Sequence, residues 1–99
     1  MRELSYLSRE HVEAEVTATT PAGQPVNPDE LAVQLAFVAV GAEPADTDWH
    51  TAEHLRGDIF GVLIGTDALV LDRGDYDAWH QITDNPEKPV APFGKLRIY

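Results

Sequence analysis

The stretch that decides the fold is Asp72-Arg73-Gly74-Asp75-Tyr76, which reads D-x-G-x-Y. Gly74 can adopt a positive φ at a turn without steric cost, and the Asp72 side chain can accept hydrogen bonds from N–H groups of the same turn. Tyr76 then opens an alternating segment, Tyr76–Thr83, which predicts a strand. A tyrosine there can place its ring in a core while its hydroxyl finds a polar partner.

This spacing is typical of the corner before strand F of immunoglobulin-like sandwiches, where a buried tyrosine bonds back to nearby backbone. Disulfide-bonded sandwiches carry a Cys two residues after the Tyr, but here that position is Ala78 and the chain has no Cys. A generic glycine turn before a strand is the alternative interpretation. We expect Asp72, Gly74 and Tyr76 to form this structural corner.

Two apolar patterns precede the corner. His11–Thr19 alternates, with Val and Ala on one face and Glu and Thr on the other, which predicts a half-buried strand. Leu31–Val40 is almost continuously apolar, which predicts a strand that is buried on both faces or has one face against a partner. A helix begun at Pro28-Asp29-Glu30 is the alternative for that segment. Trp49–Arg56 allows either a helical turn or a polar strand.

The remaining strands are expected on both sides of the corner. Ile59–Ile64 and Ala68–Leu71 predict a hairpin around Gly65-Thr66-Asp67. A turn-rich loop from Asp84, extended by Pro92, precedes a final strand over Lys95–Tyr99 with Leu96 and Ile98 inward. The pattern is that of about seven short strands. We therefore predict one domain, residues 1–99, with an all-β, immunoglobulin-like sandwich fold.

Composition excludes several functional classes. The chain has 99 residues, 43% of them hydrophobic, and no Cys, so disulfides, thiolate zinc sites and cysteine nucleophiles are absent. No apolar run approaches the roughly 20 residues of a membrane helix, and Met1–Ser5 has no signal-peptide core, so we expect synthesis and retention in a cytoplasm. The formal charge of −10 disfavours nucleic acid. It favours solubility, or docking onto a basic surface of a partner.

The sequence has few motifs that indicate catalysis or metal binding. His50-Thr51-Ala52-Glu53-His54 matches the zinc-peptidase pattern H-x-x-E-H, which needs a helix and a third ligand. If the segment is a strand, the two His lie about 13 Å apart, too far for one metal. The carboxylate sets Asp46/Asp48, Asp75/Asp77 and Asp84/Glu87 are candidate calcium ligands without the spacing of a calcium loop. We therefore expect no enzyme activity, no catalytic residue, no metal site and no cofactor.

Aromatic residues are the candidate partner contacts. If Tyr76 faces the core, alternation places His80 inward, as a satisfied core histidine, and Trp79 outward. An outward Trp predicts a contact for a partner, and a covering loop over Asp84–Gly94 is the alternative. Trp49 and Tyr99 complete the candidate contacts. The last strand, ending at Ile98-Tyr99, is expected to leave edge hydrogen-bonding groups for a neighbour.

The C-terminal half resembles a group of small proteins of actinobacterial tailed phages, encoded among the capsid and head-to-tail connector genes. The matching stretches are Asp48-Trp49, Ile59–Ile64, Gly74–Trp79, Ile82–Val90, and Gly94 with Leu96–Tyr99. The chain departs from the group's pattern at His80, where an aliphatic residue is expected, and at His54, where a Trp is expected.

The resemblance implies a β-sandwich structural protein of the virion, made in the host cytoplasm and packed against other virion proteins at the neck or connector. A capsid decoration or minor capsid protein is the first alternative. A small carbohydrate- or receptor-binding β-domain is the second. We expect partners with a basic docking surface, in a homo-oligomeric ring or array or in contact with other virion proteins. We expect no nucleic acid and no membrane.

Overall fold

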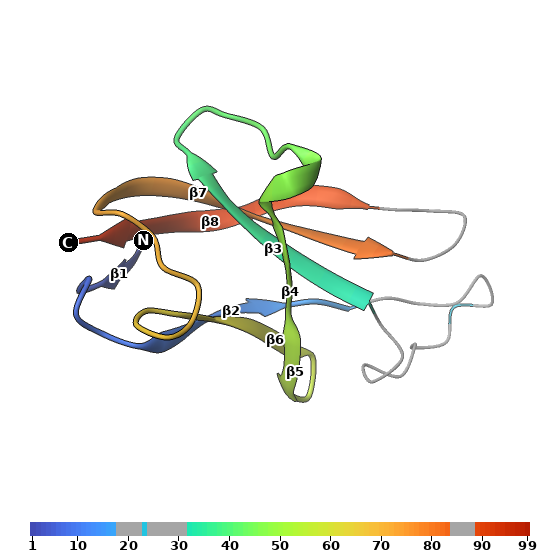
Figure 1. The fold of residues 1–99 in the computed structure, drawn as a ribbon. Helices are drawn as coiled ribbons and strands as arrows, with labels where there is room; N and C mark the ends of the chain where they lie inside the picture. The colour runs from blue at the N-terminus through green and yellow to red at the C-terminus, as the bar shows by residue number, and fades with distance from the viewer. Residues whose placement is uncertain (18–22, 24–31, 84–88) are drawn as a thin grey trace.

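The computed structural model describes residues 1–17, 23, 32–83 and 89–99. These residues form eight strands in two sheets that lie face to face (Figure 1). The larger sheet has the order β1 (Arg2–Leu4), β8 (Val90–Ile98), β7 (Gly74–Thr83), β3 (Ala32–Ala39) and β4 (Trp49–Thr51). The smaller sheet has the order β2 (Glu10–Glu15), β6 (Ile59–Ile64) and β5 (Glu53–Arg56). A 3-10 turn, η2 (Asp46–Asp48), precedes β4.

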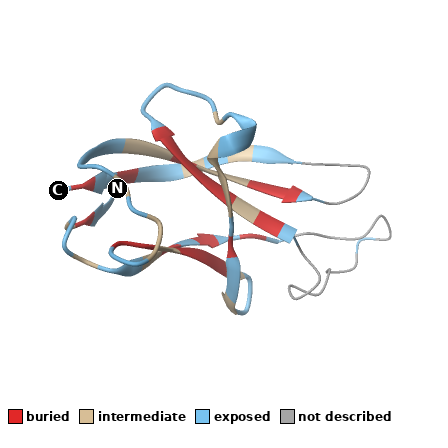
Figure 2. Ribbon diagram, in the orientation of Figure 1, coloured by how far each residue is buried: buried red, intermediate tan, exposed pale blue. Residues whose placement is uncertain are grey.

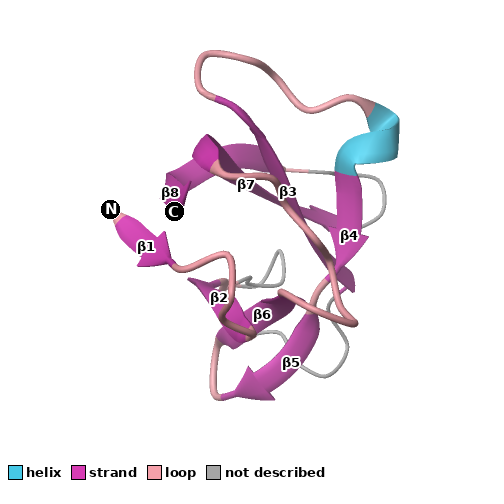
Figure 3. Ribbon diagram, turned by 60° about the vertical axis from the view of Figure 1, so that its left-hand side comes forward, coloured by secondary structure: helices cyan, strands magenta, loops and turns pink. Residues whose placement is uncertain are grey.

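The hydrophobic core lies between the two sheets, whose facing layers are seen from a second side in Figure 3. Buried residues concentrate on the strands, and the connecting loops are largely exposed wherever the structure describes them (Figure 2). Both sheets supply the largest fully buried side chains, which are Leu4, Leu35, Phe60 and Leu96. No helix in the described part of the chain is long and apolar enough to cross a membrane.

Strand β3 is buried on both of its faces, as its sequence predicts, and the helical alternative for this segment is wrong. Val33, Leu35 and Phe37 belong to the core cluster. Ala36 and Val38 are also buried but lie outside that cluster. Because successive side chains of a strand point to opposite faces, Ala36 and Val38 lie on the outer face of the larger sheet.

The corner before β7 has a specific hydrogen bond. The Tyr76 hydroxyl donates to the backbone carbonyl oxygen of Asp72 at 2.6 Å, and Gly74 adopts a positive φ of 150°. The Tyr76 ring is half-buried against the core, and this burial, together with the nearby Asp72 carboxylate, raises the pKa of the Tyr76 hydroxyl. The bond therefore ties the strand to the loop that leads into it.

The hairpin predicted for Ala68–Leu71 is wrong. Leu69 forms only an isolated parallel bridge with Ile64, and the Gly65 N–H bonds to the Leu69 carbonyl at 2.9 Å. Gly65 and Asp67 both have positive φ, so the chain curls at this point. The physical reason is topological, because the chain must leave the smaller sheet after β6 to reach β7 in the larger one.

The C-terminal strand begins earlier than predicted. Pro92 lies inside β8, beside a register irregularity opposite Ala78 and Trp79. Proline lacks an N–H, so it is tolerated in a sheet where a bulge or a free edge leaves that donor unneeded. Both conditions hold, because β1 pairs with β8 only over Leu96–Ile98. Residues 84–88 of the predicted loop lie outside the described residues.

The expectation of free edge groups at the end of the last strand is also wrong. Strand β1, which the sequence analysis does not predict, runs parallel to the end of β8. The Tyr99 N–H donates to the Leu4 carbonyl at 2.9 Å, and the Tyr6 N–H donates to the Tyr99 carbonyl at 2.7 Å. These backbone groups of Tyr99 are therefore satisfied within the chain.

The ambiguous segment Trp49–Arg56 is extended. Its first part is β4 in the larger sheet and its second part is β5 in the smaller sheet, so the chain changes sheets at Ala52. The predicted strand over His11–Thr19 corresponds to β2, with Val12, Ala14 and Val16 buried. Its end at Ala18 and Thr19 lies outside the described residues.

Replacing Tyr76 by Phe should lower the free energy of unfolding by about 1 kcal/mol, since the bond to the Asp72 carbonyl is lost. Denaturant unfolding of the purified protein measures this difference. Tyr99→Phe is the matched control, because the Tyr99 side chain is exposed. Equal midpoints for wild type and Tyr76→Phe would show that the corner bond contributes nothing.

Candidate functional site: the outer face of the larger sheet

The two tryptophans lie in one row on the outer face of the larger sheet. The register pairs Trp49 of β4 with Ala36 of β3, and Ala36 with Trp79 of β7. Trp79 in turn pairs with Pro92 of β8. Ala36 is 0% exposed although it lies outside the core cluster. We call these four residues, Trp49, Ala36, Trp79 and Pro92, the tryptophan strip.

Both tryptophans are half-buried, and Trp79 does not belong to the hydrophobic core or to the side chains packed against it. Its Nε1 is buried and has no hydrogen-bond partner among the described residues. A tryptophan donor usually finds a partner when it is buried. The strip therefore presents partly exposed apolar area on the face of the sheet opposite the core, while the Trp79 Nε1 itself is shielded from solvent.

Ion pairs flank the strip on one side. Lys95 of β8 contacts Asp77 of β7 at 2.9 Å, and the same carboxylate accepts the Gly41 N–H at 2.9 Å. In the next row Arg97 contacts Asp75 at 2.7 Å and Glu3 at 3.7 Å, joining β7, β8 and β1. Opposite charges on adjacent strands stabilise a sheet. These two rows form a charged rim beside the strip.

These contacts shift the pKa values of both aspartates. The hydrogen bond from Arg97 lowers the pKa of Asp75. The Gly41 N–H, followed by Lys95, lowers the pKa of Asp77. Asp75 and Asp77, named from the sequence as candidate calcium ligands, are therefore engaged by cationic side chains.

Neutral polar residues flank the strip on the other side. Gln81 of β7 donates from Nε2 to Oε1 of Gln34 on β3. Gln34 also pairs in register with Thr51 of β4. Gln81 is buried even though it lies outside the core cluster, so its amide partner satisfies a group that would otherwise be costly to bury.

His80 lies on the opposite face of β7 from Trp79. It is half-buried and its ring stacks on Phe93, with the two centroids 5.6 Å apart. Burial lowers the pKa of His80 and so favours the neutral ring. Its Nδ1 has no hydrogen-bond partner among the described residues, so the prediction of a satisfied core histidine is wrong in that respect.

The zinc-peptidase pattern does not form a helix. His50 lies on β4 and His54 on β5, in different sheets. The His54 Nε2 is 2.7 Å from the Gly57 carbonyl oxygen, and its ring lies 5.1 Å from that of Phe60. Among the described residues, no group of three or more His, Cys, Asp or Glu side chains could hold a metal ion.

Of the other carboxylates named from the sequence, Asp46 and Asp48 belong to the turn η2, directly before Trp49. Asp48 accepts the Ala45 N–H at 2.8 Å and closes the turn η2. Asp84 and Glu87 lie outside the described residues. Tyr99 is exposed at the end of β8, next to β1 and away from both tryptophans.

The outer face of the smaller sheet carries ion pairs that the sequence analysis does not identify. Arg56 of β5 contacts Glu13 of β2 at 3.0 Å, and His11 of β2 contacts Glu53 of β5. Both pairs span the intervening strand β6, where Gly61 leaves room. A Cβ at Gly61 would lie 2.7 Å from the Leu55 side chain. A side chain at this position would therefore require the Leu55 side chain to shift.

The comparisons with known proteins give no family assignment. No protein-family model matches the chain, no curated protein matches it, and no solved structure matches it.

Asp77→Asn should destabilise the protein near pH 7 but not in strong acid. The pKa of Asp77 is lowered on folding from an ordinary value of 3.8. The contribution is therefore complete above that value and is lost as the pH falls through the lower folded-state pKa. Thermal unfolding of wild type and variant measures the difference in Tm, which should be present near pH 7 and shrink as the pH falls below 3.8.

Asp67→Asn is the control for this substitution, since Asp67 is an exposed turn residue with φ of 62° and Asn tolerates that conformation. It should leave the melting midpoint unchanged at every pH. A Tm difference for Asp77→Asn that stays constant with pH would contradict the electrostatic account.

Proposed function

We propose that the protein is a non-enzymatic structural module that packs against neighbouring subunits through the tryptophan strip. The single observation that carries this proposal is the row of Trp49, Ala36 and Trp79 on the solvent side of a sheet whose other side builds the core. Protein interfaces typically have an apolar, aromatic centre and a polar rim. The strip has that arrangement, with the Lys95–Asp77 row on one flank.

The fold we infer for this module is the immunoglobulin-like sandwich. The order β2-β6-β5 corresponds to strands B-E-D, and the order β8-β7-β3 corresponds to G-F-C. Strand β4 takes the position of C′ beside C, and β1 the position of a first strand at the edge of G. The Tyr76 bond to the Asp72 carbonyl supports the assignment, because a tyrosine corner lies before strand F.

The setting we propose is the virion of a tailed phage, at the head-to-tail neck or connector. This rests on the resemblance of the C-terminal half to phage structural proteins, and that half supplies β6, β7 and β8. The same contact face would serve a capsid decoration or minor capsid protein, so position in the particle is a separate question. Mass spectrometry of purified virions and a map of the intact particle answer it.

The partner we propose has a basic docking surface. The chain carries a formal charge of −10, and complementary charge accelerates and orients association. Surface charge interactions are screened by salt. Assembly should therefore weaken as the salt concentration rises.

Trp49→Ala and Trp79→Ala test the strip. Both variants should remain folded, with a loss of about 1–2 kcal/mol for the half-buried Trp79 and less for Trp49 on its edge strand. Incorporation of each variant into virions should fall by about tenfold or more, as for a central interface residue. Circular dichroism and quantitative mass spectrometry of purified particles measure the two effects.

Val70→Ala and Leu7→Ala are matched controls, since both side chains are exposed and apolar but lie away from the strip. They should be incorporated like wild type. If both tryptophan variants are incorporated normally, the strip is not a contact surface. If only Trp79→Ala unfolds, Trp79 stabilises the fold and is not a contact residue. Binding to a glycan array that is lost in Trp49→Ala would replace assembly by carbohydrate binding.

A further inference from the structure

One edge of strand β2 is unpaired within the described part of the chain. Strand β2 is the end strand of the smaller sheet and pairs only with β6 among the described strands. The Val16 N–H donates to the Asp58 carbonyl at 2.8 Å, and residues of an antiparallel strand bond to the same neighbour at every second position. The backbone N–H and C=O groups that face the free edge are therefore those of His11, Glu13 and Glu15.

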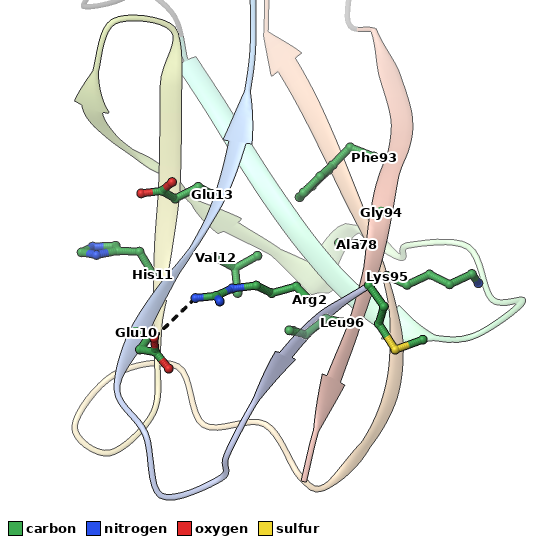
Figure 4. A pocket seen from close by; sticks show the side chains of 11 residues that line it. Arg2, Glu10, His11, Val12, Glu13, Ala78, Phe93, Gly94, Lys95 and Leu96 are labelled. Atoms are coloured by element: carbon green, nitrogen blue, oxygen red, sulfur yellow. Dashed lines mark hydrogen bonds and ion pairs between the residues drawn. The ribbon is translucent and has the colours of Figure 1, made fainter.

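A groove of about 760 Å³ lies beside this edge, between β2 and β8 (Figure 4). Its floor includes Val12, Ala78 and Leu96, three side chains that also belong to the hydrophobic core. Arg2 and Glu10, 3.5 Å apart, bridge the two sheets across one part of it. These three side chains are themselves buried, so the groove reaches the edge of the core without exposing it.

Strands β1, β2 and β8 all border the groove, and only β2 offers an edge that is both regular and longer than three residues. Strand β8 is covered by β1 over Leu96–Ile98, and the rest of it contains Pro92 and an irregular register. Proline and bulges disrupt pairing at a sheet edge. Strand β2 contains neither proline nor glycine and keeps a continuous register over Glu10–Glu15.

The charge on β2 determines which strand can pair with it. Glu13 and Glu15 are exposed. Glu13 contacts Arg56, while Glu15 has no ion pair among the described residues. Opposite charges on adjacent strands are favourable and like charges are unfavourable. A second copy of β2 would place glutamates near glutamates, whereas a strand that carries Lys or Arg would complement them.

We propose that the β2 edge and its groove form a strand-addition site for an extended segment of a partner protein in which apolar residues alternate with Lys or Arg. The segment's backbone pairs with His11, Glu13 and Glu15, its apolar side chains enter the groove above Val12, and its basic side chains lie beside Glu15. Strand addition draws affinity from main-chain hydrogen bonds and specificity from the alternate side chains. This site is separate from the tryptophan strip, so either can fail alone.

The test uses a synthetic seven-residue peptide of alternating Lys and Val, with both ends blocked, and the full-length protein. A peptide of the same composition with its Lys and Val residues grouped is the control. The alternating peptide should bind saturably, and about tenfold more tightly than the grouped one. Hydrogen exchange followed by NMR should show about tenfold slower exchange for the amides of His11, Glu13 and Glu15, but not for those of Val12 and Ala14, which already bond to β6.

Two variants locate the binding site. A Cβ at Gly94, which lines the groove, meets no atom within 4 Å, so Gly94→Leu should fold normally, fill the groove and weaken peptide binding about tenfold. Glu15→Lys should also weaken peptide binding, because it places a positive charge beside the Lys residues of the peptide. Glu43→Lys, with the same charge change in an exposed loop, and Trp49→Ala should bind like wild type.

Several results would overturn the proposal. These are no saturable binding of the alternating peptide, equal binding of the two peptides, protection of β8 amides in place of the three β2 amides, or wild-type binding by both Gly94→Leu and Glu15→Lys. None of them bears on the tryptophan strip.

Discussion

The pairing of β3 with β7 is the contact on which the other features of this molecule depend. It joins eight residues of each strand in one continuous antiparallel register, from Ala32 opposite Thr83 to Ala39 opposite Tyr76. Because side chains alternate, this register directs Val33, Leu35 and Phe37 into the core and assembles the tryptophan strip on the other face. A slip of one residue would exchange the two faces, so the core and the candidate contact surface are specified together.

Much of the strand pattern could be predicted because it depends on local periodicity. The alternation of β2, the apolar run of β3 and the segment Ile59–Ile64 each correspond to a strand of the structure. The hairpin at Ala68–Leu71 was wrong because apolar residues after a turn also serve a connection that crosses between sheets. Strand β1 was not predicted because a three-residue strand is too short to show alternation. The start of β8 was not predicted because a proline such as Pro92 usually indicates a loop.

The candidate site was predictable in part. Alternation from Tyr76 is enough to place Trp79 on the outward side of β7, but no sequence spacing relates it to Trp49, whose position depends on β3 lying between them. From the sequence alone, the carboxylates Asp75 and Asp77 are candidate cation ligands. Their real partners, Arg97 and Lys95, come from a strand about twenty residues further along the chain. Such contacts depend on the register between strands that are distant in the chain, and that register cannot be read from a single sequence.

The parallel pairing of β1 with the end of β8 has a mechanical consequence. The two strands run in the same direction, with Arg2, Glu3 and Leu4 opposite Leu96, Arg97 and Ile98. A force that pulls the start of β1 away from the end of β8 therefore acts along the strands and shears this ladder, so that its hydrogen bonds share the load. The ion pair of Arg97 with Glu3 joins the same two strands, whereas the ion pair of Arg97 with Asp75 joins β8 to β7. Tension along the strands must therefore break the hydrogen bonds of the β1–β8 ladder together. A force perpendicular to the strands would break them one at a time.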